Sequence, residues 1–286
     1  MGKKLGAASL SIGVNVLLLI SKIVVAFITN SIGLYAESAH SFFDLVASML
    51  AYLGIRKAEE PEDRTHHFGH EKFENLSSML QALLITGTAF IVIFEAYQKL
   101  SMPSDVEFSE AGIALMLISI PVTLFTSRYL GDVARKEGSS ALEADSAHFT
   151  TDVISSASVL LGLILVRLGY AFGDPLGAAV VGVVMLYISL ELLRHSFMVF
   201  MDFSPDKATM EKIEDILRDE QNSKRITRYH KIRARVAGSR VLADLHIHLP
   251  HKTSVVDGHR ISHEIETRIL REVPQVKEVS VHIEPD

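Results

Sequence analysis

Residues 7–29 read AASLSIGVNVLLLISKIVVAFIT, a run in which Lys22 is the only charged residue. A helix needs about 20 predominantly apolar residues to cross the hydrocarbon core of a bilayer, so this run is long enough to span one. Comparable runs recur along the chain and predict an all-α transmembrane bundle of six helices. The six candidate spans are 7–29, 32–55, 76–100, 111–130, 144–168 and 175–200.

Composition divides the chain into two parts. Of its 286 residues, 48% are hydrophobic, and the long apolar runs end near Phe203. Charged residues dominate from Ser204 onward. We therefore expect a six-helix transmembrane domain over residues 1–203 and a separate polar domain over residues 204–286.

The basic residues predict how the chain is oriented in the membrane. Lys and Arg gather at the N-terminus and in the connections that follow the second and fourth spans. The positive-inside rule assigns these segments to the cytoplasm. Because the number of spans is even, we expect residues 204–286 to be cytoplasmic as well.

The polar domain has the pattern of a small α+β unit. A helical pattern over 205–217 precedes two strand-like runs, 226–236 and 241–249, which are joined by turn residues. An amphipathic helix around 261–269 and a strand over 276–283 complete the order αββαβ. This order predicts a three-stranded sheet with two helices on one face, a ferredoxin-like arrangement.

Charge and cysteine content exclude two kinds of site. The formal net charge is −6, and no Lys/Arg block with interleaved aromatic residues occurs, so we expect no nucleic acid partner. The chain also has no cysteine. Thiolate ligands are therefore excluded, and any metal site must be built from His, Asp and Glu.

Two of the candidate spans carry the same pair of polar residues at the same spacing. His40 and Asp44 are four residues apart in the second span, and His148 and Asp152 are four apart in the fifth. Each pair projects from one helix face, because a helix turns once in 3.6 residues. Two imidazoles and two carboxylates make a tetrahedral set suited to Zn²⁺. Interhelical hydrogen bonding is the alternative role, but it would not require the same residue types twice.

Histidines and acids gather at two further places. The connection after the second span holds Asp63, His66, His67 and His70 within eight residues, a crowding that suits metal capture. In the polar domain, strand alternation places several His, Asp and Glu residues on the polar faces of two strands. Solvated polar surface is the alternative interpretation of both clusters.

Four stretches carry a resemblance to a known family. They are SIGLYAESAHSFFD at 31–44, HFGHEK at 67–72, EADSAHFTTD at 143–152 and GDP at 173–175. With them, the chain resembles the cation diffusion facilitators, a family of zinc-exporting antiporters. The resemblance covers nearly the whole chain and implies the same fold that the apolar runs and the αββαβ tail predict.

The resemblance also implies three groups of metal ligands and a homodimer, with the cytoplasmic group of ligands at the dimer interface. They are His40, Asp44, His148 and Asp152 as the transport site, Asp63, His66 and His70 as a loop site, and His230, His246, His259, His282 and Glu284 as a cytoplasmic zinc site. His67 is expected to be a bystander, and His248, His251 and His263 are expected to be surface residues.

The resemblance implies efflux of a divalent cation. Zn²⁺ is the expected substrate, and Mn²⁺, Fe²⁺ or Cd²⁺ as the main substrate is the alternative. Zinc binds neutral imidazole and ionised carboxylate, so protons compete for the same atoms. An imidazole with a pKa near 6.5 exchanges protons at cellular pH, which favours zinc/proton antiport by alternating access. The short connection between the fourth and fifth spans lacks the His-rich insertion of many eukaryotic relatives, so we expect a prokaryotic plasma membrane.

Two other classes of membrane protein stay open at this stage. A metal receptor or sensor would use the cytoplasmic sites, but it has no reason for paired ligands at bilayer depth. An intramembrane metalloenzyme would need a general base and an open coordination position. The sequence has no His-Glu-x-x-His or comparable motif, so we expect no enzyme.

Overall fold

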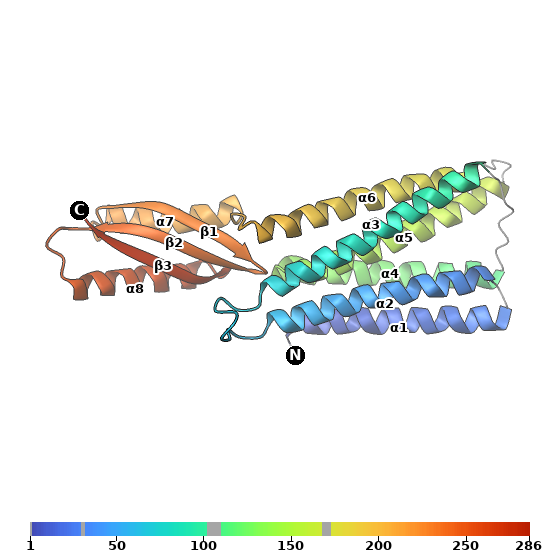
Figure 1. Cartoon of the computed structure of the whole chain (residues 1–286), viewed down its shortest axis with the longest axis horizontal. Helices are drawn as coiled ribbons and strands as arrows, with labels where there is room; N and C mark the ends of the chain where they lie inside the picture. Colours follow the sequence, from blue (N-terminus) through green and yellow to red (C-terminus); the bar gives the residue numbers. More distant parts are fainter. Residues whose placement is uncertain (1, 30–31, 102–109, 168–172) are drawn as a thin grey trace. The chain divides into compact units, whose positions relative to one another are not determined.

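The computed structural model describes residues 2–29, 32–101, 110–167 and 173–286. The chain forms two compact units, Met1–Phe197 and Met198–Asp286. Six long helices make up the first unit (Figure 1): α1 (Lys3–Thr29), α2 (Ile32–Ala58), α3 (Lys72–Ser101), α4 (Glu110–Glu137), α5 (Ser140–Arg167) and α6 (Gly173–Phe200). Ser31, which begins the stretch 31–44, and Leu168, which ends the fifth candidate span, lie outside the described residues.

Hydropathy separates these helices into two sets. Among the described residues, four helices are long and apolar enough to cross a membrane, and they lie within α1, α3, α4 and α6. The helices outside this set, α2 and α5, carry the two His/Asp pairs. A helical region of membrane type is therefore confirmed, whereas six spans stay a prediction.

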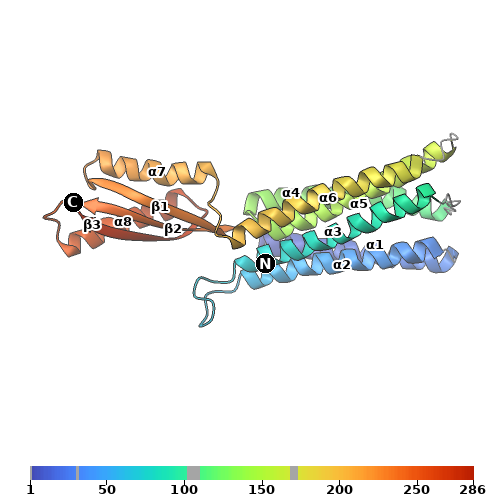
Figure 2. The same cartoon turned by 45° about the horizontal axis from the view of Figure 1, so that its top comes forward.

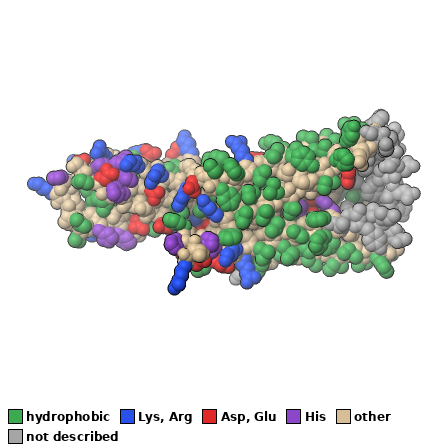
Figure 3. Space-filling model, viewed as in Figure 1, with side chains coloured by type: hydrophobic (Ala, Val, Ile, Leu, Met, Phe, Trp, Pro, Cys, Tyr) green, Lys and Arg blue, Asp and Glu red, His purple; other side chains and the backbone are tan. Residues whose placement is uncertain are grey.

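The outer surface of the helical unit is apolar. Figure 3 shows hydrophobic side chains covering the visible face of these helices. Large side chains on different helices are well exposed, with Phe27 at 78%, Phe125 at 71% and Tyr187 at 69%. A contiguous surface of this kind is unfavourable in water and suits contact with lipid.

Small and hydroxyl side chains bring the helices together. Thr86 of α3 donates to Ser189 of α6 over 2.9 Å, and Ser127 of α4 donates to the carbonyl of Ser146 on α5 over 3.0 Å. Gly54 of α2 lies against α3, where an added Cβ would stand 2.4 Å from Ser77. Such close approach is typical of helices that associate without water between them.

A buried ion pair ties several helices at one end of this unit. Lys4 of α1 donates to Glu74 of α3 over 2.6 Å, and Ser139 donates to the other carboxylate oxygen over 2.7 Å. Ser139 belongs to the tight turn between α4 and α5, in which Gly138 has a φ of 63°. A left-handed residue of this kind is usually glycine and ends a helix abruptly. The start of α1 and α3 is thereby held beside the α4–α5 turn.

The second unit is the predicted α+β domain (Figure 2). Its elements are α7 (Lys207–Asn222), β1 (Arg228–Ala237), β2 (Arg240–Leu249), α8 (Val255–Glu272) and β3 (Val276–Pro285). The sheet order is β1-β2-β3, with β1 antiparallel and β3 parallel to β2. The small αββαβ domain expected from the sequence is confirmed.

One face of this sheet forms the hydrophobic core. Leu245 and Ile247 of β2 pack with Ile213 of α7 and with Ile265 and Ile269 of α8, all fully buried. Because side chains alternate along a strand, the even-numbered residues of β2 lie on the opposite face, away from the helices. That opposite face carries the histidines.

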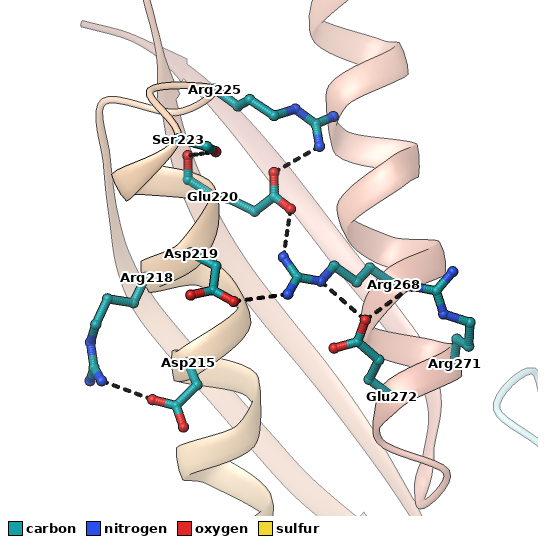
Figure 4. A network of polar contacts seen from close by, with 9 residues as sticks. All are labelled: Asp215, Arg218, Asp219, Glu220, Ser223, Arg225, Arg268, Arg271 and Glu272. Carbon is teal, nitrogen blue, oxygen red and sulfur yellow. Dashed lines mark hydrogen bonds and ion pairs between the residues drawn. The ribbon is translucent and has the colours of Figure 1, made fainter.

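An ion-pair network joins the two helices of this unit (Figure 4). Arg268 of α8 contacts Glu220 and Asp219 of α7, each at 2.9 Å, and Glu272 of its own helix at 3.2 Å. Arg225 adds a second contact to the buried Glu220 at 2.9 Å. These carboxylates raise the pKa of Arg268 above its ordinary value. The network fixes α7 and α8 beside each other over the core.

Candidate metal sites

The two helices with His/Asp pairs meet inside the helical unit. Nε2 of His148 on α5 lies 3.1 Å from Oδ1 of Asp44 on α2, and Nε2 of His40 lies 3.7 Å from the same oxygen. Ligand atoms of His40, Asp44 and Asp152 all lie within 4.8 Å of one another. The structure therefore brings together all four residues of the predicted transport site.

Burial differs among these four side chains. Asp44 and His148 are 6% exposed as residues, whereas the side chain of His40 is 44% exposed. Nδ1 of His148 is buried and has no hydrogen-bond partner among the described residues. The other ring nitrogen, Nε2, faces the Asp44 carboxylate and is the atom with which His148 can bind a cation held by Asp44.

A polar network that the sequence did not single out supports this cluster. Asn15 of α1 donates to the carbonyl of Asp44 over 3.2 Å and to the hydroxyl of Ser48 over 2.8 Å. Ser48 in turn donates to Asp145 over 2.8 Å and shares a 2.6 Å hydrogen bond with Ser11. Isolated Ser and Asn residues are common in apolar helices, so no sequence signal set these apart.

The loop cluster is also drawn together. Oδ1 of Asp63 lies 3.3 Å from Nδ1 of His66, and Oδ2 lies 3.4 Å from Nε2 of His70. Hydrogen bonds from the Thr65 hydroxyl and from the Thr65 and His66 amides hold the pKa of Asp63 well below its usual range. His67 instead directs Nε2 to the carbonyl of Arg64 at 3.1 Å.

His70 is the buried member of that loop cluster. It is 2% exposed, and Nδ1 lies 3.1 Å from the carbonyl oxygen of Pro61. A carbonyl only accepts, so Nδ1 carries the proton and Nε2 keeps its lone pair. This Nε2 has no hydrogen-bond partner within the described chain, and it is oriented toward Asp63.

The third cluster lies on the sheet face of the second unit. His230 of β1, His246 of β2 and His282 of β3 are paired in register across the three strands. Ligand atoms of His230, His246 and Glu284 lie within 4.8 Å of one another. The closest pair is Nδ1 of His246 and Oε1 of Glu284, at 2.7 Å.

The pKa shifts of two groups on this face favour the binding of a cation. Burial lowers the pKa of His230, which favours the neutral imidazole that metals bind. A hydrogen bond from His246 lowers the pKa of Glu284, which favours the carboxylate. Both groups are therefore in the state required of a ligand near neutral pH.

Two other histidines of this domain were singled out in the sequence, His259 as a ligand and His248 as a surface residue. His259 lies on α8, where its ring stacks on His263 at 6.3 Å, and it is not part of the group on the sheet face. His248 was expected at the surface, which is wrong, because it is only 3% exposed. Alternation along β2 indicated the correct face, but it could not show that neighbouring strands cover this position.

An apolar-surfaced helical unit and three clusters of imidazole and carboxylate groups characterise proteins that handle metal cations at a membrane. Comparison with known proteins indicates the same class of protein. Residues 8–201 match the cation efflux transmembrane domain, and residues 205–286 match the cytoplasmic domain of cation efflux proteins. The first match spans more than half of the chain, so the chain belongs to the cation efflux family, the cation diffusion facilitators.

Individual relatives are similar over almost their full length. An uncharacterized transporter of Methanocaldococcus jannaschii is 28% identical, over 96% of this chain and 96% of that protein. The cation-efflux pump FieF of Shewanella oneidensis is 28% identical, over 98% of this chain and 93% of the pump. The metal-bound C-terminal domain of the CzcD transporter from Thermotoga maritima is 22% identical, over 28% of this chain and 94% of that domain, with a TM-score of 0.26.

Proposed function

We propose that this chain exports divalent metal, with Zn²⁺ as its first substrate, through a six-helix transmembrane bundle. The observation that carries the proposal is the convergence of Asp44 and His148 from two different helices, with His40 and Asp152 within ligand reach of Asp44. Ionisable groups in an apolar bundle are costly and are retained for function. Four of them around one point favour transport over a purely structural role.

Donor spacing and donor type support zinc. Around a tetrahedral zinc with bonds of about 2.0 to 2.1 Å, neighbouring ligand atoms are separated by about 3.3 Å. The separations at Asp44, 3.1 Å to His148 and 3.7 Å to His40, are close to this value. Two imidazoles favour zinc over Mg²⁺ or Ca²⁺, which prefer oxygen ligands.

Exchange for protons follows from the same ligands. Zinc requires neutral imidazole and ionised carboxylate, so a proton and a zinc ion exclude each other at His40 and Asp152. We propose that the site loads zinc from the cytoplasm, opens outward and releases zinc as protons enter. Exporting a cation against an inside-negative potential costs about 2.3 kcal/mol per charge per 100 mV, which incoming protons offset.

The other two clusters would capture zinc and regulate its transport. The loop group of Asp63, His66 and His70 would collect zinc on the cytoplasmic side. The sheet-face group would bind regulatory zinc and draw together the cytoplasmic domains of a homodimer in a prokaryotic plasma membrane. Replacing both His246 and His282 by Ala tests the regulatory role, since an unchanged zinc dependence of transport would contradict it.

Zinc uptake into proteoliposomes tests the transport proposal. With an acidic interior, the full chain should move external zinc inward as protons leave, and Asp152→Ala should abolish this flux. His195→Ala is a matched control, because His195 lies on an exposed position of α6, away from the site. Zinc binding without flux would instead indicate a receptor, and flux of Mn²⁺, Fe²⁺ or Cd²⁺ in preference to zinc would reassign the substrate.

A further inference from the structure

His248 occupies an unusual position on the sheet face. It is 3% exposed, although it lies on the side of β2 away from the helices. In register it is paired with Glu284 of β3 and with Arg228 of β1. A buried histidine needs partners for both ring nitrogens, and those partners decide what it can do.

The first nitrogen of this ring has partners outside the metal-ligand group. Nδ1 of His248 lies 3.2 Å from the carbonyl oxygen of Pro285, which can only accept a hydrogen bond. Nη2 of Arg228 lies 3.4 Å from the same nitrogen. Nδ1 is therefore occupied by contacts outside the metal-ligand group, and Nε2 is the nitrogen that faces that group.

The second nitrogen is oriented toward the metal-ligand group. Nε2 of His248 lies 3.1 Å from Oε2 of Glu284 and 3.2 Å from Nδ1 of His230. The two ring nitrogens share a hydrogen bond, and a cation bound between them would take the place of its proton and contact both nitrogens and the carboxylate. Both separations match the spacing of about 3.3 Å between donors around a tetrahedral zinc.

We propose that His248 is a metal ligand and that it completes a zinc site with His230, His246 and Glu284. The inference rests on the proposed cytoplasmic zinc site and changes its composition. His282, 62% exposed and 3.9 Å from Glu284, lies at the rim of this group. The carbonyl of Pro285 orients the His248 ring, as outer-shell hydrogen bonds orient the ligands of many zinc sites.

This composition has a structural consequence. All four ligands come from one protomer, on three neighbouring strands of one sheet. Three nitrogens and one carboxylate oxygen are a complete tetrahedral set. The site can therefore hold zinc without a ligand from a second copy of the chain.

The test uses the full chain with the other two sites disabled by Asp44→Ala and Asp63→Ala. In that background, His248→Leu should weaken zinc binding, measured by competition with a chelator, by about tenfold or more. His263→Leu is the control, because that side chain is 69% exposed on α8 and should leave the affinity unchanged. Unchanged affinity in His248→Leu would overturn the proposal.

A second variant does not depend on loss of binding. The chain has no cysteine, so His248→Cys introduces a single thiolate. If position 248 contacts the metal, bound Co²⁺ should show a thiolate-to-cobalt charge-transfer band, and His263→Cys should show none. Bound Co²⁺ without this band in His248→Cys would overturn the proposal. The proposal would also be overturned if the chain with Asp44→Ala and Asp63→Ala bound no zinc at all. In that case, zinc flux by the unmodified chain would still support the proposed transport function.

Discussion

Nε2 of His148 lies 3.1 Å from Oδ1 of Asp44, although 104 residues separate them in sequence. The contact joins α5 to α2 within the helical unit, and it leaves Nδ1 of His148 buried without a partner among the described residues. One contact therefore defines which faces of two helices are turned toward each other. The following predictions test the arrangement around it and in the cytoplasmic domain.

The polar network behind the proposed transport site should contribute to stability. Ser48→Ala removes the hydroxyl that contacts Ser11, Asn15 and Asp145 and takes one hydrogen-bond donor from the buried Asp145 carboxylate. An unpaired buried polar group costs about 1–3 kcal/mol, so the apparent Tm of the purified chain in detergent should fall. Ser21→Ala is the control, since the exposed Ser21 hydroxyl donates to the carbonyl of Leu17 on its own helix. Equal Tm values for the two variants would contradict the importance of the network.

The loop site should matter most when zinc is scarce. Asp63→Ala removes the carboxylate that both His66 and His70 contact, and it should weaken zinc capture by about tenfold. We expect a raised KM for zinc flux with little change in kcat, because the intramembrane ligands are untouched. His67→Ala should leave both constants unchanged, since Nε2 of His67 is directed to a backbone carbonyl. An equal effect of the two variants would exclude Asp63 as a capture ligand.

The network around Arg268 should stabilise the cytoplasmic domain. Arg268→Met removes one of the two arginines that contact Glu220 within the described part of the chain, and because the Glu220 side chain is 5% exposed, this should cost about 1–3 kcal/mol. Arg271→Met, at a position 71% exposed, should cost far less. A fluorophore on a single cysteine introduced by His263→Cys would report urea unfolding of α8 in the full chain. Equal urea midpoints for the two variants would contradict this account.

The same network predicts a pH dependence. Hydrogen bonds from Arg271 and Arg268 lower the pKa of Glu272 from its ordinary value of 4.5. The folded domain therefore keeps this carboxylate ionised at a pH where the unfolded chain already binds a proton. Its stabilisation is fully present above pH 4.5 and is lost as the pH falls through the lower folded pKa. In Glu272→Gln, the urea midpoint should change less between pH 5 and pH 3; an unchanged slope would show that Glu272 does not contribute.

Helix positions were predictable from hydropathy, but helix ends were not. The fourth span was expected over 111–130, whereas α4 continues to Glu137. The third was expected from residue 76, whereas α3 begins at Lys72. Hydropathy marks the segment that suits lipid, while Ala, Arg, Lys and Glu continue a helix beyond it. The charged ends then make contacts such as the pair between Lys4 and Glu74.

Residues of the proposed site could be singled out in the sequence where the same residue types recur at one spacing. The pairs at His40 and His148 are recognisable because each histidine precedes an aspartate by four residues in an apolar helix. Asn15 and Ser48 carry no such pattern, and only packing shows that they contact the site. His248 shows the limit of strand alternation, which assigns a face but not the burial of a side chain on that face.

The ligand shell of the intramembrane metal tests the central claim most directly. Asp63→Ala and Glu284→Ala together should disable the loop and cytoplasmic sites, leaving one zinc per chain. X-ray absorption at the zinc edge should then show two imidazole nitrogens and two carboxylate oxygens at about 2.0–2.2 Å, and a further Asp44→Ala should release the ion. A zinc that persists after Asp44→Ala, or a shell without imidazole, would contradict the account.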